Sequence, residues 1–241
     1  MARLTVYGRM PVLEALADER VDVERLLVAR NARGIDDILE AARARGVAVQ
    51  RVAPEKVTRV SGNGRHDQGV VADVSAPGVA ELAEWSPPPV AAVVVLDRVT
   101  NPSNVGMVVR AWTAAGLEGV VLPRAGVPDV GPLVVKASAG VAFRAPLLRC
   151  PTAAEGIGVL AAAGFGVIGL RGDDGEPLWS AALPERAAYV LGNESEGVSP
   201  AVAGLVTTWV SIPLAGGVES LNVATAAAVL AYEVARRRSA P

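Results

Sequence analysis

The stretch AAVVVLDRVTNPSNVGMVVRAWTAAG, residues 91–116, decides the fold of the larger part of the chain. Its first six residues are apolar without a break, which is typical of a parallel strand buried on both faces. A polar turn follows, and after it the apolar residues recur at helical spacing. The stretch therefore predicts a strand that leads into a helix, the repeating unit of an α/β fold.

The same alternation continues from this stretch to the end of the chain. The final segment, LNVATAAAVLAYEVARRR, predicts an Ala-rich helix whose last turn carries cations that interact favourably with the helix dipole. We therefore expect residues 91–241 to form a mainly parallel sheet covered by helices on both faces. Further strands are predicted at GVVLP (119–123), LLRC (147–150), FGVIGLR (165–171), AAYVLGN (187–193) and WVSIPL (209–214).

Toward the amino terminus, residues 1–76 predict a smaller α/β domain. Pro54 suits the first turn of a helix, and Gly46 suits the position just after one. Residues 77–90 contain the run Pro87-Pro88-Pro89 and predict an extended linker between the two domains. The predicted elements of the smaller domain are helices at 11–16 and 35–46, strands at 23–29, 47–52 and 68–75, and a short element that begins at Ala53.

Composition limits the possible function classes. Hydrophobic residues make up 51% of the chain, no apolar run is long enough to cross a bilayer, and the first residues, MARLTVYGRM, lack the apolar stretch of a signal peptide. We therefore expect a soluble cytoplasmic protein that does not bind a membrane. The single cysteine, Cys150, is expected to be a buried, inert thiol, and no second cysteine is available to join His66 in a zinc site. The net charge of −2 does not by itself indicate a nucleic-acid-binding protein.

One motif suggests a dinucleotide site that the sequence around it argues against. Residues 164–169, GFGVIG, match G-x-G-x-x-G, but the fingerprint must follow a strand and open a helix. Here a predicted helix precedes the glycines and a predicted strand follows them. We therefore interpret Gly164 as the end of a helix and expect no nicotinamide or flavin site.

Three polar segments follow predicted strands: residues 97–106, which open a helix that carries Arg110 further along, residues 191–200 and residues 211–223. Open α/β sheets bind ligands at the carboxyl ends of their strands, so the three segments would converge if those strands were neighbours. In the first, Asn104 followed by Arg110 most simply indicates a helix N-cap and an arginine lying over an apolar helix. The second is equally a capped connection or a binding loop, and Ser220 and Asn222 in the third are candidates for helix capping.

Taken in order, NPSNVGMVVR, LGNESEGVSP and IPLAGGVESLNVATA resemble the three motifs of the SpoU (TrmH-like) branch of the SPOUT RNA methyltransferases. YGRMPVLEAL and RHDQGVVADV further resemble the substrate-binding domain of members that methylate a guanosine ribose in large-subunit ribosomal RNA. The resemblance implies an L30e-like RNA-binding domain, a C-terminal trefoil-knot domain, S-adenosylmethionine as cofactor and a homodimer formed through the C-terminal domain. Two departures are Ala111-Trp112-Thr113, where relatives commonly have an acid, and Met10, where several have His.

The resemblance also implies the site residues. Gly192, Ile212 and Leu221 match positions that bind the cofactor, largely through backbone groups, while Arg110, Asn104, Glu194, Ser220 and Asn222 match the catalytic set. The reaction is a displacement in which a ribose 2′-oxygen attacks the sulfonium methyl group, so it needs no metal and no acid for the leaving group. The difficult step is activation of the nucleophile, because a ribose hydroxyl is a weak acid and must lose its proton as the new bond forms.

A charged guanidinium has no acceptor atom, so Arg110 is not expected to act as a literal base unless the substrate helps to deprotonate it. We expect it to orient the target and stabilise oxyanion character, with the other four residues holding Arg110 and the ribose. Two alternatives remain open at this point. One is a transfer RNA or another ribosomal RNA site as substrate, and the other is a non-catalytic RNA-binding dimer.

Overall fold

This computed structural model describes residues 2–76, 79–172 and 174–239. The chain divides into two compact units, and each is described by itself. Unit 1 comprises residues 1–78 and 130–144, and unit 2 comprises residues 79–129 and 145–241. Within the described ranges, no helix is long and apolar enough to cross a membrane.

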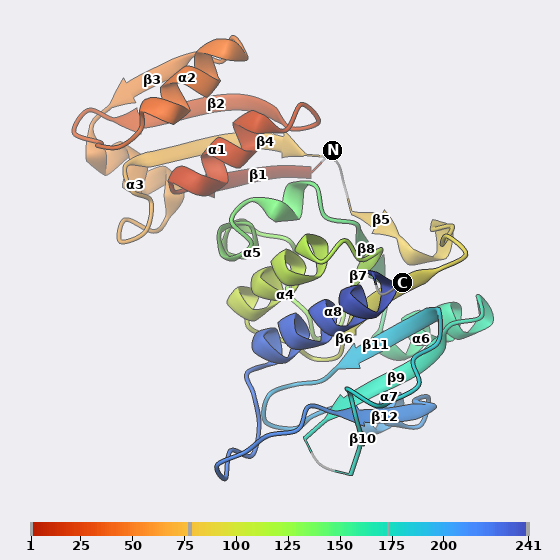
Figure 1. The fold of residues 1–241 in the computed structure, drawn as a ribbon. Helices are drawn as coiled ribbons and strands as arrows, with labels where there is room; N and C mark the ends of the chain where they lie inside the picture. The colour runs from red at the N-terminus through yellow and green to blue at the C-terminus, as the bar shows by residue number, and fades with distance from the viewer. Residues whose placement is uncertain (1, 77–78, 173, 240–241) are drawn as a thin grey trace. The chain divides into compact units, whose positions relative to one another are not determined.

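Unit 1 is built on a mixed four-stranded sheet with the strand order β1-β4-β2-β3 (Figure 1). β2 pairs with β3 in parallel, and β4 lies antiparallel to both β1 and β2. Gly46 has a φ of +68° directly after the second helix, and Pro54 is the first residue of the third, as predicted. The elements are β1 (Ala2–Tyr7), α1 (Arg9–Ala17), β2 (Asp22–Ala29), α2 (Asp36–Ala44), β3 (Val49–Val52), α3 (Pro54–Ser61), β4 (Val70–Ala76), α5 (Pro132–Ala137) and the 3-10 helix η2 (Val141–Phe143).

Three elements of unit 1 were not predicted: β1, α5 and η2. β1 is held by pairing with β4, about 70 residues later in the chain, for example Leu4 with Val74. α5 has only six residues, too few to display a helical period. α5 and η2 also come from the middle of the range predicted for the larger domain, so chain order alone did not indicate that they associate with unit 1.

Unit 2 is built on an eight-stranded sheet with the order β10-β12-β9-β11-β6-β7-β8-β5. Every pair of strands described in it is parallel, which confirms the predicted α/β class and the mainly parallel sheet. The elements are β5 (Ala80–Glu81), the 3-10 helix η1 (Leu82–Glu84), β6 (Ala91–Leu96), α4 (Pro102–Ala114), β7 (Gly119–Pro123), β8 (Leu147–Cys150), α6 (Ala153–Ala162), β9 (Gly166–Arg171), β10 (Glu176–Pro177), β11 (Arg186–Leu191), α7 (Pro200–Ala203), β12 (Thr208–Ser211) and α8 (Val223–Ser239).

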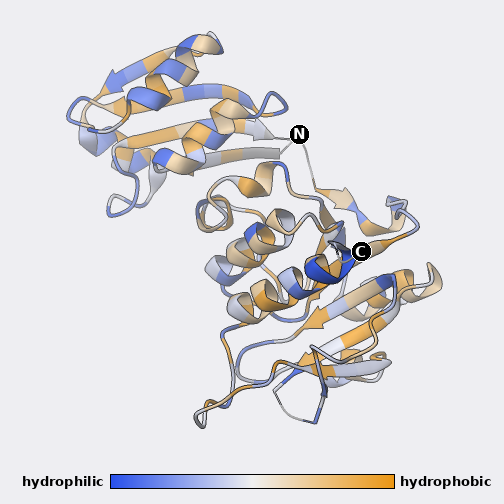
Figure 2. Ribbon diagram, in the orientation of Figure 1, coloured by the Kyte–Doolittle hydropathy of each residue, from blue (hydrophilic) through white to orange (hydrophobic). Residues whose placement is uncertain are grey.

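Helices cover both faces of this sheet (Figure 1). All six residues of β6 are buried, and Val93 and Val95 pack in one cluster with Ile157 and Leu160 of α6. α4 and α8 lie side by side, with Trp112 and Leu230 fully buried. Figure 2 shows the central strands almost continuously hydrophobic, the pattern that a doubly covered parallel sheet requires.

Residues 79–90 contain more structure than an extended linker would. β5 pairs with β8 at the edge of the sheet, and Leu82 in η1 is 2% exposed within the core cluster of unit 2. Gly164 follows α6 with a φ of +84° and β9 begins at Gly166, which confirms the interpretation of GFGVIG as a helix end followed by a strand.

The connection from β9 to β11 takes an unusual course. β9 and β11 are neighbours in the sheet, yet β10, between them in the chain, pairs with β12 on the far side of β9. After it, the amide of Leu178 donates to the carbonyl of Ser211 (2.8 Å), and Arg237 of α8 donates to the carbonyl of Ala181 (2.6 Å). The connection therefore borders β12 on its outer side and contacts the helix that follows, as a knotted path would require. The trefoil knot itself stays a prediction.

Candidate active site

The polar segments predicted from the sequence follow strands whose carboxyl ends share one edge of the unit 2 sheet. β6 and β11 are direct neighbours, and β12 is separated from β11 only by β9. Because all four strands are parallel, the loops after them emerge at the same edge. The convergence expected from the sequence therefore occurs, with the loop after β9 as a fourth contributor.

A cavity opens between these loops, with about 710 Å³ of empty space that is partly open to solvent. Concave sites at this edge of a parallel sheet are where small molecules bind. Five of the eight predicted site residues line it: Gly192, Glu194, Ile212, Ser220 and Leu221. The rest of the wall is Leu170, Arg171, Gly172, Leu191, Asn193, Gly197, Leu214, Val223 and Ala226, so it is largely apolar with a few polar groups.

Asn104 does not cap its helix, contrary to the simplest interpretation of the sequence. The cap of α4 is Asn101, whose side-chain oxygen accepts a hydrogen bond from the amide of Ser103 (2.9 Å). Asn104 is only 5% exposed, and its amide group donates to the carboxylate of Glu194. Its carbonyl oxygen accepts from the side chain of Asn222 (3.2 Å). Asn104 therefore links Glu194 to Asn222, residues from two other loops.

Asn222 has a second role, at the start of α8. Its side-chain oxygen accepts from the amide of Ala224 (2.9 Å), so the predicted helix cap is confirmed for this residue. Ser220 is exposed and lines the cavity, and no capping hydrogen bond from it occurs among the described residues. The hydrogen bonds Glu194–Asn104–Asn222 thus tie the 192–199 loop and α4 to the start of α8.

The 192–199 loop is a tight turn that the protein holds in place. Gly192 approaches the backbone of Gly197 so closely that an added Cβ would lie 2.2 Å from its carbonyl carbon. The side chain of Asn193 accepts from the amide of Ser195 (2.9 Å) and donates to the carbonyl of Arg98 (3.1 Å). Glycine at position 192 is therefore required by packing, because any side chain would displace the turn.

A second anchor joins this loop to the end of β6. Asp97 is 4% exposed, and its carboxylate accepts from the amide of Ser199 at 2.6 Å. The side chain of Arg98, whose φ is +59°, pairs with Glu196. Both ends of the loop that carries Glu194 are thus fixed to the first polar segment, so the carboxylate is held beside Asn104.

Arg110 lies apart from this group within one chain. It is exposed on α4, on the same stripe as Met107 and Ala114, and it does not line the cavity. Among the described residues it has no hydrogen bond or ion pair. Six residues separate it from Asn104, which turns the two side chains to different sides of the helix. The expectation that the other catalytic candidates hold Arg110 is therefore not met inside a single chain.

Packing explains why Ala111-Trp112-Thr113 follows Arg110 where relatives commonly have an acid. Trp112 is fully buried, its ring meets that of Tyr189 edge-on at 5.9 Å, and its indole nitrogen donates to the carbonyl of Ala92 (3.4 Å). Burial raises the pKa of Tyr189 to about 12. The hydroxyl of Thr113 is buried without a partner among the described residues. The helix is therefore held to the sheet by aromatic packing.

The sequence interpretation missed the contribution of β9. Its last residues, Leu170 and Arg171, and the following Gly172 line the cavity, and the guanidinium of Arg171 lies 4.8 Å from the ring centre of Trp209. The available signal was position, because β9 is a parallel strand whose carboxyl end must reach the ligand edge.

Two family models match the chain. The model of the SpoU rRNA Methylase family matches residues 91–232, and the model for RNA 2′-O ribose methyltransferase substrate binding matches residues 5–79. The first model spans the strands, loops and helices that build the cavity. The two matches together account for most of the chain.

Individual proteins are similar over most of their length. The chain is 35% identical over 215 residues to a 23S rRNA (guanosine-2′-O-)-methyltransferase RlmB of Ralstonia nicotianae, a match covering 87% of this chain and 85% of that protein. It is 34% identical over 241 residues to an uncharacterized tRNA/rRNA methyltransferase of Mycolicibacterium vanbaalenii, covering 97% and 76%. The solved structure of the SpoU methyltransferase AviRb from Streptomyces viridochromogenes in complex with AdoMet matches with a TM-score of 0.81 and 26% identity, covering 98% of this chain and 90% of that one.

Proposed function

The chain belongs to the SpoU rRNA methylase family of RNA 2′-O-ribose methyltransferases, and on that premise we propose that it methylates a guanosine 2′-hydroxyl in large-subunit ribosomal RNA, using S-adenosylmethionine. The observation that carries the proposal is the cavity at the ligand edge of the parallel sheet, with the hydrogen-bonded group Glu194–Asn104–Asn222 beside it. The guanosine target is supported by the RlmB relative. A ribosomal substrate also favours the cytoplasmic location expected from the sequence.

The residues of the cavity fit the cofactor. Ile212, Leu214 and Leu221 give an apolar surface suited to a nucleobase, while Gly192 brings the backbone close to the cavity. Arg171 and Asn193 supply polar groups for a charged amino-acid end. When bound, S-adenosylmethionine supplies the methyl group on a sulfonium centre. Gly192, Ile212 and Leu221 are the residues that we expect to hold it.

The polar group beside the cavity would position the ribose. Glu194 offers a carboxylate that can accept a hydrogen bond from a ribose hydroxyl, and Asn104 holds that carboxylate in one orientation. Ser220, on the opposite loop, can donate or accept. The remaining requirement is a cation that stabilises the oxygen as its proton leaves, and Arg110 is our candidate for it.

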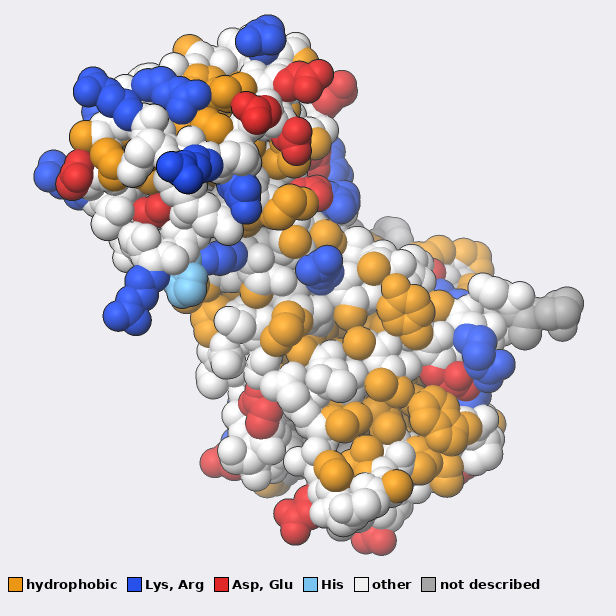
Figure 3. All heavy atoms as spheres, turned by 60° about the vertical axis from the view of Figure 1, so that its left-hand side comes forward, with side chains coloured by type: hydrophobic (Ala, Val, Ile, Leu, Met, Phe, Trp, Pro, Cys, Tyr) orange, Lys and Arg blue, Asp and Glu red, His pale blue; other side chains and the backbone are white. Residues whose placement is uncertain are grey.

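We propose that Arg110 serves the cavity of a second copy of the chain. Arg110 shares its exposed stripe on α4 with Met107, which is 42% exposed, and α8 alongside exposes Tyr232 by 57%. Figure 3 shows that hydrophobic side chains cover much of one face of unit 2. An exposed patch of this kind on two adjacent helices suits a two-fold dimer interface. Such a dimer would bring Arg110 near a partner's ribose site.

The proposed function is tested by mapping the product. Large-subunit rRNA from cells without the gene is incubated with the protein and S-adenosylmethionine, and 2′-O-methylation is located by primer extension at low dNTP concentration. A stop at one guanosine supports the proposal. Methylation of transfer RNA alone would favour that alternative, as the uncharacterized tRNA/rRNA relative allows.

Cofactor binding separates the enzyme from the non-catalytic alternative. Titration calorimetry with S-adenosylmethionine and with S-adenosylhomocysteine should give binding in the micromolar range, and Leu221→Arg should abolish it by filling the cavity. If neither compound binds, with or without RNA, while RNA itself binds, the chain is a binding protein and the proposal fails.

A further inference from the structure

We infer that RNA docks on one end of the unit 1 sheet, which we call the loop end, through arginines that the protein leaves unpaired; this inference rests on the proposed function. The loop end is the edge at which Tyr7, Ala29 and Val52 finish β1, β2 and β3 and at which Val70 begins β4. The strand register places these residues together: Tyr7 pairs with Val71, Val28 with Val70, and Ala29 with Val52.

Four segments that connect strands to helices or strands meet at the loop end, and hydrogen bonds join them. The amide of Gly8 donates to the carbonyl of Val70 (3.1 Å), and the amide of Ala29 donates to the carbonyl of Gly69 (2.8 Å). The side chain of Gln68 accepts from the amide of Arg9 (2.8 Å). The connections thus form one ordered surface, so a ligand would bind without having to order separate loops first.

Six exposed cations among the described residues belong to this surface, in addition to the half-buried Lys136, which donates to the carbonyl of His66 (3.1 Å): Arg9, Arg30, Arg33, Arg51, Lys56 and Arg65. Among the described residues, Arg30, Arg33, Lys56 and Arg65 make no side-chain hydrogen bond or ion pair, and Arg9 and Arg51 donate only to backbone carbonyls. None of the six is therefore neutralised by a described carboxylate.

The acids at the loop end offset only part of this positive charge. Asp67 is 5% exposed and is occupied by hydrogen bonds from the hydroxyls of Thr58 and Ser61 and from the amide of Gly69. The remaining acids, Asp36, Asp37 and Glu55, sit in the first turns of α2 and α3. Since α1, α2 and α3 all begin at this edge, their dipoles direct positive potential toward it.

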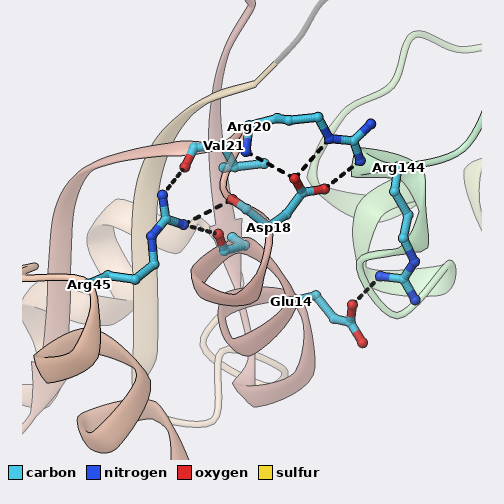
Figure 4. A network of polar contacts seen from close by, with 7 residues as sticks. Glu14, Asp18, Arg20, Val21, Arg45 and Arg144 are labelled. Atoms are coloured by element: carbon cyan, nitrogen blue, oxygen red, sulfur yellow. Dashed lines mark hydrogen bonds and ion pairs between the residues drawn. The ribbon is translucent and has the colours of Figure 1, made fainter.

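Several arginines at the opposite end of unit 1 are held in ion pairs. Arg20 pairs with Asp18 (2.7 Å), Arg25 with Asp73 (2.5 Å), and Arg144 with Glu14, whereas Arg43 and Arg59, in the last turns of α2 and α3, make no ion pair among the described residues. Figure 4 shows the Arg20–Asp18 and Arg144–Glu14 pairs together with Arg45, which donates to backbone carbonyls, including that of Val21 (2.8 Å). In Figure 3, blue side chains gather toward one side of unit 1 and red ones toward the other.

This arrangement explains how an acidic protein can bind RNA. Counted from the sequence, unit 1 has 14 Arg and Lys against 11 Asp and Glu, whereas unit 2 has 9 against 14. The net charge of −2 is therefore the sum of a positive unit 1 and a negative unit 2. Five of the six loop-end cations are arginines, whose planar guanidinium binds phosphate oxygens in pairs and stacks on bases. These properties favour RNA over a membrane surface.

The test compares two triple variants that remove the same charge. One carries Arg30→Gln, Arg33→Gln and Arg65→Gln at the loop end, and its control carries Arg20→Gln, Arg25→Gln and Arg144→Gln at the paired end. The probe is a fluorescein-labelled RNA hairpin, followed by anisotropy over a salt series, because phosphate binding is independent of sequence. Calorimetry with S-adenosylmethionine and thermal unfolding check that both proteins fold; Arg20→Gln alone replaces the control if the triple is unstable.

We expect the loop-end variant to bind the hairpin roughly 10-fold or more weakly. The plot of log association constant against log salt concentration should also become less steep, its slope decreasing in magnitude by about 2 to 3. The control should stay within about two-fold of the unmodified protein, and both should keep their affinity for S-adenosylmethionine. The loop-end variant should also show a raised KM for rRNA with little change in kcat.

Three outcomes would overturn the inference. The two variants could lose RNA affinity equally, or the loop-end variant could bind RNA as tightly as the unmodified protein. The third is a loop-end variant that keeps its RNA affinity and loses only binding to phosphatidylserine vesicles, measured as a second probe. Failure of the proposed function looks different. In that case S-adenosylmethionine binding or methyl transfer would be missing from the unmodified protein, while its RNA affinity would still depend on the loop end.

Discussion

At the scale of single residues, two asparagines of the same helix region have different roles, one in capping the helix and one in holding the site together. Asn101 caps α4, whereas Asn104 links Glu194 to Asn222. Asn104→Ala should slow the methyl-transfer step by roughly 10²-fold, since small displacements of reacting groups are costly, and leave cofactor affinity nearly unchanged. Asn101→Ala should instead cost about 1 kcal/mol of stability with little effect on the rate. Single-turnover kinetics and thermal unfolding of the two variants check this, and equal rate losses would contradict the assignment.

Cys150, the single cysteine of the chain, reports burial directly. It is 4% exposed, and burial raises the pKa of its thiol to about 11. Very little thiolate is therefore present at pH 8, and we expect alkylation by iodoacetamide to be at least about 10²-fold slower in the folded protein than in denaturant. Mass spectrometry over time measures both rates. Similar rates in the two conditions would show that the thiol is accessible.

At the scale of elements, the end of α8 depends on one buried carboxylate. Glu233 is 7% exposed and accepts hydrogen bonds from Arg236 (2.8 Å) and Arg237 (2.7 Å), which lower its pKa to about 2. Its ordinary value is 4.5. Because the pKa is depressed by folding, the stabilisation is complete above about pH 4.5 and is lost as the pH falls toward 2.

Glu233→Gln should therefore lower the unfolding free energy by about 1 to 3 kcal/mol at neutral pH and by progressively less toward pH 2. Urea unfolding at several pH values checks whether the unfolding free energies of the variant and the unmodified protein become equal as the pH falls. Arg237→Gln should cost more than Arg236→Gln, because Arg237 also binds the carbonyls of Leu178 and Ala181, while Arg236 is 64% exposed. A constant difference between Glu233→Gln and the unmodified protein at all pH values would refute the assignment.

At the scale of the whole molecule, the dimer proposal predicts that one substitution separates the subunits. Tyr232→Arg places a charge in the exposed α4–α8 face and should give a monomer in sedimentation velocity, with methyl transfer lost. The control is Val159→Arg on α6, at a position 40% exposed, which should leave the assembly unchanged. A fully active monomer of the first variant would exclude a shared site.

Mixing two inactive proteins tests whether Arg110 acts across the dimer. Subunits carrying Arg110→Ala and subunits carrying Asn104→Ala are exchanged, so that mixed dimers contain one site with both groups intact only if Arg110 comes from the partner. About a quarter of the activity should then return, from half of the dimers with one working site each. No recovery despite proven exchange would mean that Arg110 acts within its own chain or not at all.

The sequence by itself determined the α/β class, six strands of the parallel sheet, the cap at Asn222 and five residues of the cavity wall. The class, the strands and the cap follow from apolar runs and local residue patterns, and the five cavity residues follow from the resemblance of three motifs to those of the family. Only the tertiary structure decided that Asn104 joins Glu194 rather than capping α4, that the end of β9 enters the cavity, and that Arg110 lies outside it. The physical reason is strand order: it brings together side chains about 90 to 120 residues apart in the chain, and no local pattern encodes that order.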